Sequence, residues 1–246
     1  MEIQVVVPSH KRADRVSTTL LVPWAKLCVP ESQADAYRVA NPGIEIIEHP
    51  DSIPGLCRKR DWIYRRFGNV LMLDDDLTGF NRLYTEPGEA YEVDPATAYE
   101  IIQRTGWTAR QVGAYLWGFA HQPNPVTYKS QKPFVLTGYV TGCAMGMLSG
   151  SKLYFDPAVR CNEDYWVSLL NAYYHRRVFK DMRFCWLQKD TFKNRGGLSE
   201  IRNLDVERED FEYLRRVFGD VVELKKPSSA KKSLRHPFEK QISLPY

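Results

Sequence analysis

Short apolar runs alternate with amphipathic segments through the first eighty residues of the chain. The apolar runs predict buried strands, at residues 3–7, 27–29, 44–48 and 70–73. The amphipathic segments predict helices, at residues 32–39 and 56–67. Because strand and helix alternate, the pattern indicates an α/β fold with a mostly parallel, twisted sheet flanked by helices.

The second half of the chain has a different pattern, which predicts a mixture of strands and helices. Helical segments are expected at residues 95–104, 108–120, 163–178 and 206–218. Residues 133–151 carry no charge, but four glycines make a pair of strands at 134–148 a better interpretation than a membrane span. We expect one domain over residues 1–224, in halves 1–80 and 81–224, followed by a basic tail over 225–246.

Composition indicates a folded, soluble protein. The chain has 246 residues, 43% of them hydrophobic, which suits a single core. The amino terminus is unlike a signal peptide, and the five scattered cysteines lack metal-binding spacing, so we expect a cytoplasmic protein without a membrane partner. No GxSxG, P-loop or GxGxxG motif occurs, which argues against hydrolases, P-loop kinases and Rossmann dehydrogenases of those classes.

Three consecutive acids, Asp74, Asp75 and Asp76, follow the predicted strand at residues 70–73. Carboxylates at the end of a buried strand need neutralisation, and Mg²⁺ or Mn²⁺ would supply it while holding a diphosphate. Strand alternation places Asp74 and Asp76 on one face, as candidate metal ligands, with Asp75 pointing away. The plainer alternative is an acidic turn that caps the strand.

Positive charge is concentrated in two places, although the net charge is only +4. In the helix over residues 56–67, Arg58 or Arg60 is a candidate for binding a diphosphate, and a solvated basic face is the alternative. The tail carries further cations, of which Lys231, Lys232 and Arg235 are candidate DNA contacts. A solvated tail would explain those equally well.

Two further segments carry candidate chemistry. Asn162, Glu163 and Asp164 begin a predicted helix, where acids complement the helix dipole, but one of them is also a candidate general base. The segment 192–198 combines cations with paired glycines, as a loop that covers phosphates would need. A plain turn is the alternative there. The five histidines show no metal-binding spacing.

The motifs VVVPSHKR, IPGLCRKRD and VLMLDDDL resemble the nucleotide-binding half of GT-A glycosyltransferases. The resemblance implies that residues 1–80 bind a nucleotide-sugar and that 81–224 form the acceptor side. It implies donor contacts at Pro8, Ser9, His10, Arg12, Asp51, Arg58, Arg60, Asp74 and Asp75. It also implies Asp164, beside Glu163, as the catalytic base. Many inverting members have Arg-Asn where this chain has Arg60-Asp61, which leaves the role of Asp61 open.

More narrowly, PSHKR, EHPDSIPGLCRKRDWI and LMLDDDLTGF resemble the bacteriophage TET-associated glycosyltransferases. That resemblance implies sugar transfer from a UDP-sugar to 5-hydroxymethylcytosine, or another hydroxymethylpyrimidine, in DNA within the host cytoplasm. Trp107, Trp117 or Trp166 would then be available to stack beside a flipped base. Two alternatives stay open: a transferase or nucleotidyltransferase with another acceptor, and a non-catalytic basic DNA-binding module.

Overall fold

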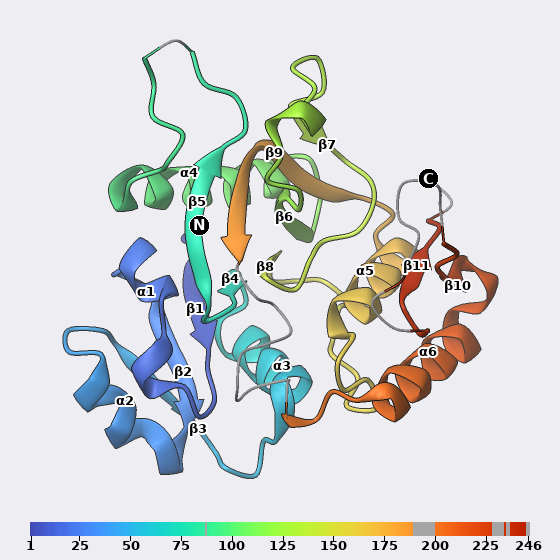
Figure 1. The fold of residues 1–246 in the computed structure, drawn as a ribbon, viewed down its shortest axis with the longest axis horizontal. Coiled ribbons are helices and arrows are strands. Elements are labelled where there is room, and N and C mark those ends of the chain that lie inside the picture. The colour runs from blue at the N-terminus through green and yellow to red at the C-terminus, as the bar shows by residue number, and fades with distance from the viewer. Residues whose placement is uncertain (87, 189–199, 228–233, 235–236, 245–246) are drawn as a thin grey trace.

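A computed structural model describes residues 1–86, 88–188, 200–227, 234 and 237–244. Within them, nine strands form one mixed sheet in the order β3-β2-β1-β4-β8-β6-β9-β5, with β7 also paired to β9 (Figure 1). The fold is therefore α/β, with one central sheet flanked by helices.

The first half of the chain builds the parallel part of the sheet. Its strands are β1 (Gln4–Pro8), β2 (Lys26–Pro30), β3 (Ile46–His49) and β4 (Val70–Leu73), all joined in parallel. The connecting helices are α1 (Thr18–Leu21), α2 (Ala34–Ala40) and α3 (Gly55–Phe67). Strands β1, β2 and β4 are short, largely buried apolar runs, and β3 at the edge of the sheet is only partly buried. The four strands and the helices α2 and α3 follow the predicted alternation, whereas the short helix α1 was not predicted.

The second half extends the sheet with mainly antiparallel pairs. Its strands are β5 (Leu77–Arg82), β6 (Leu116–Ala120), β7 (Phe134–Val135), β8 (Ala144–Met147) and β9 (Val178–Gln188). Its helices are α4 (Pro95–Gln111) and α5 (Glu163–Tyr174). Strand β8 pairs antiparallel with both β4 and β6, so it joins the two halves into one sheet.

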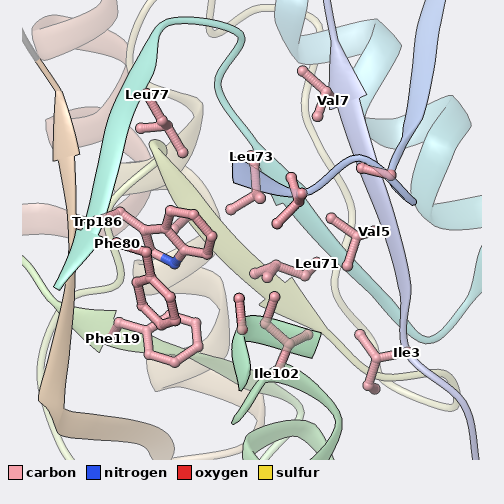
Figure 2. Packing of buried hydrophobic residues seen from close by; sticks show 14 of the residues in the cluster. Ile3, Val5, Val7, Leu71, Leu73, Leu77, Phe80, Ile102, Phe119 and Trp186 are labelled. Carbon is pink, nitrogen blue, oxygen red and sulfur yellow. The ribbon is translucent and has the colours of Figure 1, made fainter. Parts of the chain in front are cut away.

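The sheet separates two hydrophobic clusters. Along β1, Val5 and Val7 face the cluster covered by α4, whereas Val6 faces the cluster covered by α3, α5 and α6. Figure 2 shows the first cluster, in which Phe80 stacks on Trp186 with ring centroids 4.0 Å apart. Burial on both faces explains why these strands are apolar at consecutive positions.

Several predicted boundaries in the second half are wrong. The segment 108–120 is not one helix: α4 ends at Gln111, and Leu116–Ala120 is the buried strand β6. The helix that begins at Glu163 ends at Tyr174, and Val178 starts β9. The strands within 134–148 pair with other strands instead of with each other. A short apolar run gives the same pattern in a buried strand and in a buried helix, so periodicity could not separate them.

The last described elements pack beside α5. Helix α6 (Leu204–Phe218) leads to β10 (Val222–Leu224), which pairs antiparallel with β11 (Lys240–Ile242), and Figure 1 shows all three beside α5. Part of the basic tail expected over residues 225–246 is therefore a strand, β11, packed on the domain. Among the described residues, the helices are too short or too polar to cross a bilayer.

Candidate active site

A cavity of about 860 Å³ opens at the carboxyl ends of the parallel strands. The last residues of β1, β2 and β3, and the acids that follow β4, line it, as expected where parallel strands end together. The start of α5 and the α6–β11 region complete its walls. The structure brings together these residues singled out from the sequence: Pro8, Ser9, His10, Arg12, Asp51, Arg60, Asp74, Asp75, Asp76, Glu163 and Asp164.

The three aspartates after β4 have different surroundings. The Gln188 side-chain amide donates to Asp74 Oδ2 at 3.2 Å and to Asp76 Oδ1 at 2.6 Å. Asp75 instead accepts hydrogen bonds from Ser9 Oγ at 2.5 Å and from Arg12 Nη1 at 2.7 Å. The structure thus places Asp74 and Asp76 side by side and turns Asp75 toward the loop after β1.

Arg60 links the aspartates to the start of α5. Its guanidinium is 1% exposed, donates to Asp74 Oδ1 at 2.8 Å, and lies 3.6 Å from Glu163 Oε1. Burial, opposed by Arg60 and reinforced by the neighbouring carboxylates, raises the pKa of Asp74 to about 7. Burial also raises the pKa of Glu163. Both raised pKa values therefore result mainly from burial of the carboxyl groups, which the charge of Arg60 only partly offsets.

Asp164 is held by donors that point at its carboxylate. Oδ2 accepts hydrogen bonds from the Tyr139 hydroxyl and, at 3.1 Å, from the Gly142 N–H, and Oδ1 accepts one from the Tyr165 N–H at 2.9 Å. A Cβ at Gly142 would lie 3.3 Å from Asp164 Oδ2, so glycine permits this close approach. Asp164 is partly exposed, whereas Glu163 is buried against Arg60. Asp164 is therefore the more accessible of the two acids.

The opposite end of the cavity is lined by the loops after β1 and β3. His10 Nδ1 lies 3.1 Å from Gln33 Nε2, and Asp51 accepts a hydrogen bond from Ser32 Oγ at 2.8 Å. Lys59 is 4% exposed, and its ammonium donates to the Ser9 carbonyl at 2.5 Å. Burial lowers the pKa of Lys59 to about 8. A compact arrangement of polar groups thus lines this part of the cavity.

Arg58, one of the donor contacts expected from the sequence, is exposed and is not among the described residues that line the cavity. Helix α3 turns Lys59 and Arg60 toward the sheet and Arg58 toward solvent. Asp61 also lies outside that lining, where it pairs with Arg65 and accepts a hydrogen bond from the Phe155 N–H at 3.1 Å.

The tryptophans proposed for stacking are mostly core residues. Trp117 and Trp166 are 0% and 2% exposed, so neither can reach a duplex without unfolding the core. Trp107 is 54% exposed on α4 but does not line the cavity in the described part of the chain. The candidate DNA contacts Lys231, Lys232 and Arg235, and the segment 192–198, lie outside the described residues.

Sequence reasoning missed Lys59, Tyr139 and Gln188. Lys59 stands inside the basic helix, and only the phase of that helix against the sheet selects it over Arg58. Tyr139 and Gln188 come from a loop and from the end of β9, and their positions depend on long-range strand pairing. No local motif marks either residue.

The carboxylates that line the cavity can be compared with the ligands that a divalent cation requires. Among the described residues, no group of three or more His, Cys, Asp or Glu side chains is close enough to hold a metal. Asp74 and Asp76 nevertheless meet at one amide group, and carboxylate oxygens are the ligands that Mg²⁺ and Mn²⁺ prefer. Mg²⁺ commonly takes one or two carboxylates and completes its shell with water and substrate phosphates, so the site fits.

Comparison with solved structures identifies the class of fold. A crystal structure of S. aureus TarS 1–349 covers 89% of this chain and 72% of that chain, at 10% identity and a TM-score of 0.45. TarS 1–349 in complex with UDP-GlcNAc covers 89% of this chain and 65% of that chain, at 10% identity and a TM-score of 0.53. The fold is that of GT-A-type glycosyltransferases.

The family follows from the sequence itself. Residues 3–197 match the family model described as TET-associated glycosyltransferase. The chain therefore belongs to that family, and it is a glycosyltransferase. A comparison with curated proteins found no match. The family assignment excludes the non-catalytic DNA-binding module considered above.

Proposed function

We propose that this glycosyltransferase moves a sugar from a UDP-sugar to the hydroxyl of 5-hydroxymethylcytosine, or another hydroxymethylpyrimidine, in DNA. One observation carries the proposal: Asp74, Asp76 and Asp164 line a single cavity, and buried Arg60 lies between the two sets of acids. A nucleotide-sugar needs such an arrangement, with a diphosphate site at one end and a base at the other.

The proposed reaction is a direct displacement at the anomeric carbon. The acceptor oxygen forms a bond to that carbon while the bond from carbon to the diphosphate oxygen breaks, and the leaving UDP takes the electron pair. The acceptor hydroxyl proton passes to Asp164, which acts as general base. Tyr139, Gly142 and Tyr165 hold the Asp164 carboxylate in a fixed orientation for this transfer.

Asp74 and Asp76 are the proposed holders of a divalent cation. When bound, Mg²⁺ or Mn²⁺ would neutralise the charge of the leaving diphosphate. Arg60 shares this task from the protein side and keeps Asp74 in place through the 2.8 Å hydrogen bond. The loop after β1, with Ser9, His10 and Arg12, lies where it can bind the nucleotide.

Support for the donor and the acceptor comes from different sources. The TarS structure of the same fold was solved in complex with UDP-GlcNAc, which supports a UDP-sugar donor. The family description associates the enzyme with TET proteins, and the motifs resemble the phage members of that family. A base hydroxylated by a dioxygenase is the acceptor this association suggests.

A direct assay tests the proposal. The enzyme is incubated with a panel of UDP-sugars, Mn²⁺ or Mg²⁺, and duplex DNA containing 5-hydroxymethylcytosine, and nucleosides are analysed by mass spectrometry. We expect a hexosylated nucleoside with the wild type. Asp164→Asn should lose about a hundredfold or more in turnover. Asp76→Asn should lose the response to metal.

Arg58→Ala serves as the control for these variants, because Arg58 is exposed and outside the described cavity lining. Full turnover by Asp164→Asn would contradict its role as base. If the enzyme transferred sugar to a protein or polysaccharide and none to hydroxymethylated DNA, the proposed DNA acceptor would be wrong. The proposed UDP-sugar site would not be affected by that result. Salt-sensitive duplex binding separates these cases, because phosphate contacts release counterions.

A further inference from the structure

The segment that carries Asp164 is contacted by two elements that lie later in the sequence than the part of the chain matched by the family model. That match ends at residue 197, whereas α6 begins at Leu204 and β11 at Lys240. Both elements contribute side chains to the cavity wall beside Asp164. Their contacts converge on residues 160–165, the last turn of chain before α5 and the first turn of that helix.

Lys240 is at the centre of these contacts. Its side chain is 2% exposed, and its ammonium donates to Asn162 Oδ1 at 3.0 Å and to Glu207 Oε2 at 2.7 Å. Its backbone carbonyl accepts a hydrogen bond from the Tyr165 hydroxyl at 3.0 Å. One residue of β11 therefore contacts the chain on both sides of Asp164.

Asn162 is the residue that precedes α5. A side chain there ordinarily accepts a hydrogen bond from the first turn of the helix. Here the amide of Asn162 donates to Asp210 Oδ2 at 2.9 Å and to Glu207 Oε2 at 3.2 Å. The start of α5 is thus fixed by α6 and β11.

Helix α6 also holds the backbone of the same segment. Asp210 accepts hydrogen bonds from the Arg160 N–H at 3.0 Å and the Cys161 N–H at 2.8 Å. Arg202 donates to the Cys161 carbonyl at 3.0 Å, and its Nε lies 2.7 Å from Glu207 Oε1. Burying such charges is costly, and removing one partner leaves the other charge buried without compensation.

We propose that Lys240 is a positioning residue for sugar transfer, which fixes residues 160–165 so that Asp164 faces the reacting centre. Lys240 acts through Asn162 and Tyr165 and does not itself exchange a proton with the acceptor. Small displacements of a catalytic group cost much rate, because the reacting atoms must be held within a few tenths of an ångström of contact. The inference rests on the proposed role of Asp164 as base.

The experiment combines kinetics with amide hydrogen exchange on the full chain. Lys240→Met keeps the apolar stem and removes the ammonium. We expect kcat for transfer to fall about tenfold or more, while the KM for the UDP-sugar stays within about twofold, because the donor end of the cavity is untouched. Exchange of amides in a peptide spanning 160–166 should rise, whereas amides in β1 and β4 should keep their protection.

A chemical rescue separates positioning from loss of folding. Lys240→Ala should regain part of its kcat in n-propylammonium, which can donate the missing hydrogen bonds. Tetramethylammonium, which has no N–H, should not restore it. Gln241→Met is the matched control, since Gln241 is the exposed neighbour in β11 and bonds to Glu223 instead of to the 160–165 segment.

A Lys240→Met protein with wild-type kcat would overturn the proposal, whatever the rate at which its amide hydrogens exchange. So would a kcat loss accompanied by an equal loss of donor affinity and by faster exchange throughout the sheet, since that indicates general destabilisation. Should the wild type transfer no sugar to any acceptor, the proposed function fails. The exchange measurement still decides, without turnover, whether Lys240 fixes the segment.

Discussion

At the residue scale, the orientation of Asp164 depends on a hydroxyl that no sequence motif marks. Tyr139 donates to Asp164 Oδ2, and its ring lies 5.0 Å from the Tyr165 ring. A hydrogen bond to a charged group contributes about 1.5–3 kcal/mol. We therefore expect Tyr139→Phe to lower kcat about tenfold or more, with the donor KM unchanged, as measured by initial rates of transfer.

Tyr64→Phe is the matched control for that change. Tyr64 also donates a buried hydroxyl hydrogen bond, to the Leu148 carbonyl at 2.8 Å, but it lies outside the described lining of the cavity. Its substitution should lower the free energy of unfolding and leave kcat within about twofold of the wild type. An equal drop in kcat for both variants would show that Tyr139 acts through stability alone.

Two neighbouring arginines of α3 should differ sharply when truncated. Arg60→Ala leaves Asp74 and Glu163 without their buried partner, which typically costs about 3–5 kcal/mol. Arg58→Ala removes only an exposed side chain. We expect urea unfolding to show a large loss for the first variant and less than about 0.5 kcal/mol for the second. Similar losses would mean that α3 is rotated relative to the structure.

At the element scale, the first half of the fold was predictable and the second half only partly so. Strands β1 to β4 are short apolar runs separated by helices, so pattern and neighbours agree. The apolar run of β6 is equally compatible with a buried helix. The positions of β5 and β9 in the sheet depend on their pairing with each other, across more than one hundred residues of sequence. Such pairing leaves no periodic trace in a single sequence.

The central position of β8 depends on glycine. A Cβ at Gly146 would come within 2.1 Å of the Trp117 ring on β6, and Trp117 is fully buried. The ring cannot move away without disturbing its packing against Phe119. We expect Gly146→Ala to lower the free energy of unfolding by about 1–3 kcal/mol in a urea titration.

A double-mutant cycle tests the stated cause. In the background Trp117→Leu, the smaller side chain leaves room for a methyl group, so Gly146→Ala should cost less there than in the wild type. An unchanged cost in both backgrounds would locate the strain in the backbone of β8 instead. Gly146 thus serves the packing of β8, whereas composition had indicated the glycines of residues 133–151 only as a dilution of apolar character.

At the scale of the whole molecule, the site was predictable where neighbouring parallel strands end. Ser9, Asp51 and Asp74 lie at one edge of the sheet because their strands are parallel. Gln188 and Lys240 reach the same cavity from β9 and β11, more than one hundred residues away in sequence from Asp74. Their contribution follows from the closure of the fold, which no local pattern encodes.

Closure of the fold also buries a titratable group beside the cavity. His49 ends β3 with 0% exposure, and its ring centroid lies 6.0 Å from that of Trp62. Burial, followed by the charge of Lys59, lowers the pKa of His49 from 6.5 to about 4. Between these values the unfolded chain binds a proton that the folded chain does not. The free energy of unfolding should therefore fall as the pH falls from 6.5 to 4.

The size of this effect follows from linkage, at about 1.4 kcal/mol for each unit of pKa difference, or roughly 3 kcal/mol in all. Asp74 has the opposite sign: its raised pKa favours the folded state as the pH falls below 7. The contribution of His49 is therefore isolated as the difference between the wild type and His49→Asn. Asparagine retains a donor for the Pro50 carbonyl, which lies 3.0 Å from His49 Nδ1. The urea midpoints of the two proteins, measured at pH 7, 5.5 and 4.5, should approach each other as the pH falls. A constant difference between the midpoints would show that folding does not lower the pKa of His49.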